Sequence, residues 1–178
     1  MNILKNLLGM FFAVAVMALF GCGGGGGGGA AAPPTKATLK LSTAGTAGTT
    51  ISGIQVTVVL PKGVTVAATT TIDPTTMEVN QGVVLASGAA IADPAAFSQL
   101  KPIAEYTPAT ATTPGKVKIG LAAQKDFNLG EFVTLNTDIA AGNVPVATDF
   151  TLEGFTAFDS NGAPITPALT ASLVADIK

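Results

Sequence analysis

From residue 36 onward the chain alternates between apolar and polar residues with a period of two, and this pattern limits the possible folds more than any other feature. The alternating segments are rich in Thr and Val and are separated by Gly, Pro, Asn and Asp. Alternation of this kind places one face of a β-strand against a core and the other in water. Helical periodicity is almost absent, so the sequence predicts an all-β domain.

Three segments show the alternation most clearly. The residues expected to face the core are Ile54, Val56, Val58 and Leu60 in residues 51–60, Val117, Ile119 and Leu121 in residues 116–121, and Val133, Leu135, Thr137 and Ile139 in residues 131–139. By the same rule Phe132 is expected on the opposite side from Val133. Together with the remaining segments this gives eight or nine short strands, a number that favours a two-sheet β-sandwich.

One segment departs from the strand pattern. Asp93 is suited to cap a helix, Pro94 to its first position, and Ala-Ala-Phe-Ser-Gln-Leu follows. The sequence therefore predicts one short helix near residues 93–100.

The N-terminus is typical of a secretory signal. Residues 1–6 carry one positive charge, and residues 7–20 form an uninterrupted run of apolar or small residues. The run is shorter than the roughly 20 residues that span a bilayer core, so a permanent transmembrane helix is the weaker interpretation.

The run ends in Leu19-Phe20-Gly21-Cys22, which resembles the signal of bacterial lipoproteins. The resemblance implies that residues 1–21 are removed and that Cys22 is acylated, which makes membrane lipid a partner and the bacterial cell envelope the location. Gly23, in place of Asp, favours the outer membrane by the same resemblance. The alternative is that Cys22 is a buried free thiol in an ordinary signal peptide.

Residues 22–35 are expected to form a tether. Seven glycines, Gly23 to Gly29, precede an Ala- and Pro-rich stretch, a composition that behaves as a flexible coil. Its root-mean-square reach of about 20 Å would hold a domain of residues 36–178 just clear of the lipid headgroups. A phosphate-binding loop would need a preceding strand, a following helix and usually a Lys, and this stretch has none of them.

The inventory of side chains excludes most catalytic chemistry. There is no His, one Cys and no Trp, so Ser-His-Asp and Cys-His pairs and histidine-rich metal sites are excluded. Asp159, Asn161 and Gly162 resemble part of a calcium loop, but the distal acid is missing and Asn-Gly predicts a turn. A net charge of −2 without a basic cluster argues against nucleic-acid binding. We expect no enzyme activity, no cofactor and no metal.

Four segments in sequence resemble the cohesins, jelly-roll modules of cellulosome scaffolds that share a superfamily with cellulose-binding modules. They are residues 51–61, 115–122, 130–139 and 150–165, the last with Asp-Ser-Asn-Gly at its tip. The chain departs from the family at Pro61-Lys62-Gly63, where Asp-Pro is usual. The resemblance implies a binding domain for protein–protein adhesion or assembly, with a partner that the sequence does not identify.

The alternative that this superfamily implies is a polysaccharide-binding module. The amides of Gln55 and Asn136 and the single tyrosine, Tyr106, are the candidate ligand-binding residues. A stacking platform for sugars requires at least two exposed aromatic side chains. Without Trp, and with most phenylalanines after residue 22 expected in the core, that platform would be poor.

Overall fold

The computed structural model of this chain describes residues 32–46, 49–93 and 101–178. The chain divides into two units, Met1–Ala32 and Pro33–Lys178, and the described residues lie almost entirely in the second. The expected signal, the Cys22 lipidation site, most of the tether and, apart from Asp93, the helix predicted for residues 93–100 lie outside the described residues.

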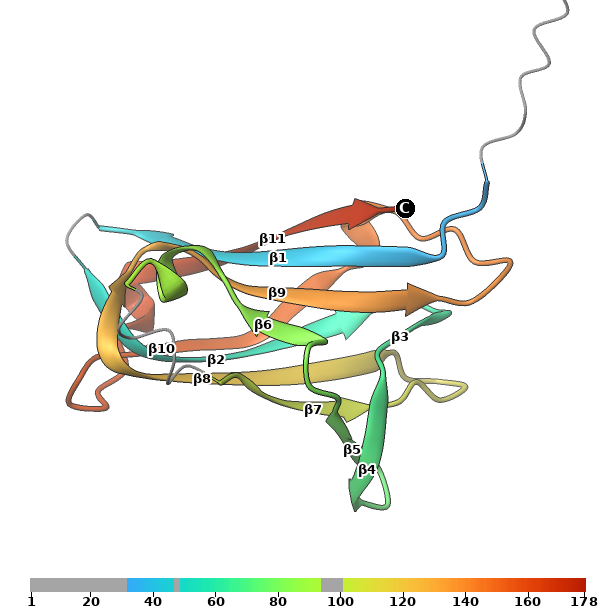
Figure 1. Ribbon diagram of the computed structural model, residues 1–178, viewed down its shortest axis with the longest axis horizontal. Coiled ribbons are helices and arrows are strands. Elements are labelled where there is room, and N and C mark those ends of the chain that lie inside the picture. The colour runs from blue at the N-terminus through green and yellow to red at the C-terminus, as the bar shows by residue number, and fades with distance from the viewer. Residues whose placement is uncertain (1–31, 47–48, 94–100) are drawn as a thin grey trace, which may run out of the picture. The chain divides into compact units, whose positions relative to one another are not determined.

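Two antiparallel sheets form the second unit, so the prediction of an all-β, two-sheet sandwich is confirmed (Figure 1). In sheet A, β1 (Lys36–Gly45) lies between β11 (Leu169–Ile177) and β9 (Gly130–Ile139), and β9 also pairs with β3 (Val64–Thr65) and β6 (Val84–Ala86). Sheet B runs in the order β10 (Thr151–Phe158), β2 (Thr50–Leu60), β8 (Gly115–Asn128), β7 (Ile103–Thr107), β5 (Thr76–Val79) and β4 (Ala68–Asp73).

The described residues hold eleven strands, more than the eight or nine expected. Strand β4, with the sequence Ala-Thr-Thr-Thr-Ile-Asp, has too few apolar residues to show alternation, and it is extended because it pairs with β5. Short 3₁₀ helices cover Gly88–Ile91, Ala147–Asp149 and Thr166–Ala168.

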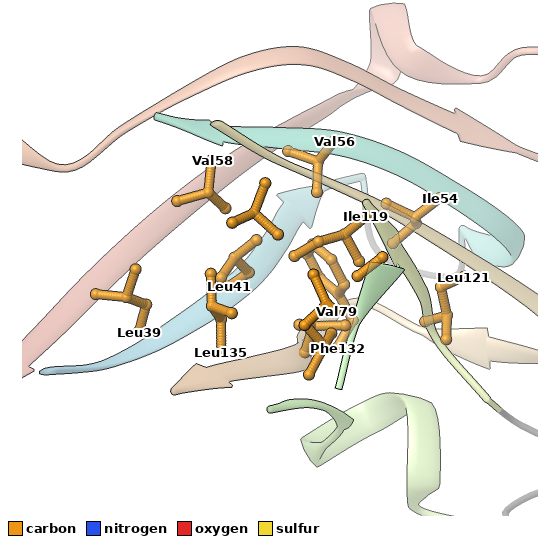
Figure 2. Close-up of a cluster of buried hydrophobic side chains, with 14 of the residues drawn as sticks. Leu39, Leu41, Ile54, Val56, Val58, Val79, Ile119, Leu121, Phe132 and Leu135 are labelled. Carbon is orange, nitrogen blue, oxygen red and sulfur yellow. The ribbon is translucent and has the colours of Figure 1, made fainter. Parts of the chain in front are cut away.

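The core lies between the two sheets. Figure 2 shows side chains such as Leu39, Val58, Ile119 and Leu135 gathered between β1, β2, β8 and β9. All the residues expected to face inward in the three clearest segments are buried. Among them Thr137 is polar, and its hydroxyl donates a hydrogen bond of 3.1 Å to the carbonyl oxygen of Ala37.

The expectation that Phe132 faces away from the core is wrong. Phe132 is 0% exposed, as is its neighbour Val133. Strand β1 pairs Leu41 with Val133 and the next residue, Ser42, with Glu131, so Phe132 is the extra residue of a β-bulge. A bulge interrupts the alternation and lets two consecutive side chains face the same way.

Candidate functional site

The three residues predicted from the sequence to bind a ligand do not come together. Gln55 is exposed on the outer face of sheet B. Asn136 is exposed on the outer face of sheet A, where its side-chain oxygen accepts a hydrogen bond of 3.3 Å from Thr38. Tyr106 is only 5% exposed and belongs to the core, and burial raises the pKa of its hydroxyl. They therefore do not form one site.

Gln55 borders a hollow of about 400 Å³ on the outer face of sheet B. Gly120 of β8 forms its floor, paired with Gln55 of β2 on one side and with Ile103 of β7 on the other. A β-carbon on Gly120 would meet only the carbonyl oxygen of Ile103, at 3.9 Å, so the space above it is open. We call the hollow lined by Gly53, Gln55, Ile103, Gly120 and Phe158 the Gly120 groove.

Apolar side chains form two walls of the Gly120 groove. Ile103 is 73% exposed, the most exposed large apolar side chain among the described residues. Phe158 of β10 pairs with Gly53 of β2, and its half-buried ring lies outside the set of residues packed on the core. An exposed aliphatic and an aromatic side chain around a bare floor make a surface that gains free energy when a ligand covers it.

Charged residues lie along one side of the Gly120 groove. Glu105 of β7 and Lys118 of β8 are cross-strand partners, and both line the hollow. Across β2 from one another, Lys116 of β8 and Glu153 of β10 form an ion pair of 2.7 Å. A ligand therefore meets an apolar floor and walls beside a row that carries both signs of charge.

A second hollow of about 630 Å³ opens between β5, β6 and β7. Its lining is largely aliphatic and includes Val79, Val84, Leu85 and Pro102. Ile103 borders both hollows. Lys101 lines both hollows as well, so the groove and the second hollow lie next to each other at the start of β7.

The calcium-like segment after β10 is a turn. Asp159 accepts hydrogen bonds through Oδ1 from the backbone N–H groups of Asn161, at 2.9 Å, and Ala163, at 2.8 Å. Its carbonyl oxygen accepts a third from Gly162, at 3.0 Å. Among the described residues, no group of three or more His, Cys, Asp or Glu side chains could hold a metal ion.

Comparisons of the chain with protein-family models, curated proteins and solved structures found no match. The likeness to cohesins rests on the four sequence segments alone. Within the described ranges, no helix combines the length and the hydropathy needed to cross a membrane.

Sequence reasoning identified Gln55 but missed the other residues of the Gly120 groove. Glycine inside a strand often marks a close approach to a ligand or another backbone. Gly120 interrupts the alternating segment 116–121 and so carried that signal. No sequence signal marked Ile103 or Phe158, because only the order of the strands in sheet B brings these residues to the groove.

Proposed function

We propose that this chain is a lipid-anchored, non-enzymatic protein of the bacterial cell envelope whose cohesin-like sandwich binds a protein partner through the Gly120 groove. The observation that carries the proposal is the bare floor at Gly120 beside the exposed side chain of Ile103. The lipid anchor is supported by the Leu19-Phe20-Gly21-Cys22 segment, and outer-membrane placement by Gly23.

The surroundings of the groove favour a protein partner. Protein interfaces combine an apolar centre with a polar rim, and most of their binding energy comes from a few side chains that enter pockets. Here the centre is Ile103, Gly120 and Phe158, and the rim includes Glu105 and Lys118. We infer that an apolar side chain of the partner lies over Gly120 and that the partner's charges pair with the rim.

A substitution at Gly120 tests the proposal. Gly120→Val fills the groove, yet the strand should accept it, because valine suits β-structure and only the Ile103 carbonyl lies within 4 Å of the new β-carbon. The matched control is Ser172→Val on β11, an exposed position of sheet A. In pull-downs from envelope extract, wild type and control should enrich the same partner, and Gly120→Val should bind it at least about tenfold more weakly. Equal enrichment by all three proteins would show that the groove is not the site.

Polysaccharide binding is the alternative, and the position of Phe158 beside Gln55 in the groove favours it. The other described aromatic side chains offer little support. Tyr106, Phe127, Phe132 and Phe150 are buried, and the half-buried Phe155 packs against the core. A glycan array probed with wild type and Phe158→Ala separates the two functions. A glycan signal that Phe158→Ala abolishes, without any enriched protein, would replace the proposal of a protein partner.

A further inference from the structure

The tether joins the folded unit beside the loop that follows β9. The N–H of Ile139 donates a hydrogen bond of 2.8 Å to the carbonyl oxygen of Thr35. The N–H of Thr35 in turn donates one of 2.7 Å to the carbonyl oxygen of Lys178. The N–H of Ala140 donates one of 2.8 Å to Gly63. Figure 1 shows the start of β1, the C-terminus and this loop at one end of the sandwich.

Two valines of the loop are exposed at this end. Val144 is 70% exposed and Val146 is 54% exposed, whereas Pro145 between them is buried. The loop therefore presents a pair of apolar side chains on either side of a buried proline.

Hydrogen bonds on both sides of the valines give the loop a defined shape. The backbone N–H and the side-chain Nδ2 of Asn143 donate to the carbonyl oxygen of Ala140, at 3.1 and 3.0 Å. The N–H of Val146 donates to Oδ2 of Asp149 at 2.8 Å, and the N–H of Asp149 donates back to the Val146 carbonyl oxygen at 3.0 Å. Because the loop is already ordered, a surface that covers the valines loses little conformational entropy.

The charges at this end are mixed. Lys36 and Lys62 are exposed, but Asp138 is the cross-strand partner of Lys36, and Lys178 forms an ion pair of 2.7 Å with Asp176. Strong attraction to anionic lipid headgroups is therefore not expected, since the positive charges are largely offset. The apolar contact of the two valines is the dominant attraction that this end offers.

We propose that Val144 and Val146 insert into the surface of the bilayer that holds the lipid on Cys22, so that the domain stands end-on with both sheet faces uncovered. The inference rests on the proposed anchor. It commits to a lipid surface because about 13 residues separate Cys22 from the point where the chain enters beside this loop. Such a short tether keeps the loop at a high effective concentration near the bilayer, so two valines suffice where they would be too weak alone.

A fluorescent reporter on the mature lipidated chain, which begins at Cys22, in phosphatidylethanolamine–phosphatidylglycerol vesicles tests the inference. Cys22 is the only cysteine, so Ala141→Cys adds one free thiol next to the valines once Cys22 is acylated. Brominated lipids should quench a fluorophore at position 141 several-fold more than one at Ser160→Cys, in the exposed turn at the other end. Replacing both valines by serine should remove the excess quenching without releasing the chain from the vesicles.

The outcomes separate the anchor from the insertion. A chain that does not float with vesicles has no anchor and overturns both proposals. A chain that floats but is quenched equally at positions 141 and 160 overturns the insertion alone. Shielding of position 141 that requires added envelope proteins would assign the valines to a protein contact and would also overturn the insertion.

Discussion

The ring of Phe158 lies against the bare backbone of Gly53 on the outer face of sheet B. A β-carbon on Gly53 would stand 3.6 Å from Cδ2 and 3.8 Å from Cβ of Phe158. The two residues are also cross-strand partners between β10 and β2. Since the ring rests on backbone at the surface, it is placed to contact a ligand while contributing little to the core.

Phe158→Ala should therefore weaken partner binding much more than it weakens the fold. We expect a loss of binding of at least about tenfold, as for aromatic residues at the centre of an interface. The free energy of unfolding should fall by about 1 kcal/mol, because the side chain is only half-buried. Binding measured by surface plasmon resonance and unfolding in urea check the two parts separately.

Phe132→Ala should weaken the fold much more than Phe158→Ala does. The side chain is fully buried at the bulge of β9, and truncation of a buried phenylalanine costs about 3–5 kcal/mol. Urea unfolding of this variant beside Phe158→Ala gives a matched comparison of one residue type in two settings. A cost at Phe132 as small as that at Phe158 would contradict its burial and the bulge.

These two phenylalanines show how far the sequence predicts the structure. Alternation within one strand is a local property, so the inward faces of β2 and β8 were predicted correctly. The bulge at Phe132 depends on how β9 registers with β1, which lies about 90 residues earlier, and no local pattern encodes it.

The Gly120 groove was largely beyond sequence reasoning for the same reason. Its lining comes from β2, β7, β8 and β10, which become neighbours only through the strand order of sheet B. Gln55 and Asn136 looked equivalent as exposed amides in alternating strands. They lie on the outer faces of different sheets, and only the assembled sandwich distinguishes them.

Gly88→Ala should destabilise the domain by more than Gly82→Ala. Both glycines have positive φ, +56° and +84°, so each substitution carries a backbone cost of about 1 kcal/mol. A β-carbon at Gly88 would also come within 2.6 Å of the Glu131 carbonyl oxygen, whereas nothing lies within 4 Å at Gly82. Overpacking should add about 1–3 kcal/mol at Gly88 alone. Equal midpoints of the two variants in urea unfolding would show that the 3₁₀ helix Gly88–Ile91 does not pack closely on Glu131 of β9.

The domain should become less stable in acid, because Glu131 becomes protonated there and loses its stabilising contacts. A hydrogen bond from Ser87 is the main cause of the lowered pKa of Glu131, and Lys40, 3.3 Å from Oε2, lowers the pKa further. A carboxyl with a lower pKa in the folded state stabilises that state above its unfolded pKa of about 4.5. This stabilisation is lost as the pH falls through the lower, folded value.

Ser87→Ala should move the pKa of Glu131 back toward its ordinary value and reduce the acid-dependent part of the stability. Thr134→Val is the comparison, because the Thr134 hydroxyl, 3.3 Å from Oε1, is the smallest contributor to the lowered pKa. Carboxyl-carbon NMR titration of both variants measures the shift directly. A larger change with Thr134→Val than with Ser87→Ala would reverse the assignment of the dominant hydrogen bond.

Cys22→Ser should abolish the lipid anchor and leave the folded domain intact. The substitution removes the thiol to which the lipid is attached, and a single remaining acyl chain gives only marginal binding at about 0.8 kcal/mol per buried methylene. The product should be soluble or remain as an uncleaved precursor. The core lies within Pro33–Lys178 and the chain has no second cysteine for a disulfide, so the unfolding midpoint of the domain should not change. Detergent partitioning of wild type and variant, with mass spectrometry of the mature N-terminus, measures both effects. An unmodified Cys22 still joined to Gly21 in the wild-type protein would contradict the anchor and the envelope location that follows from it.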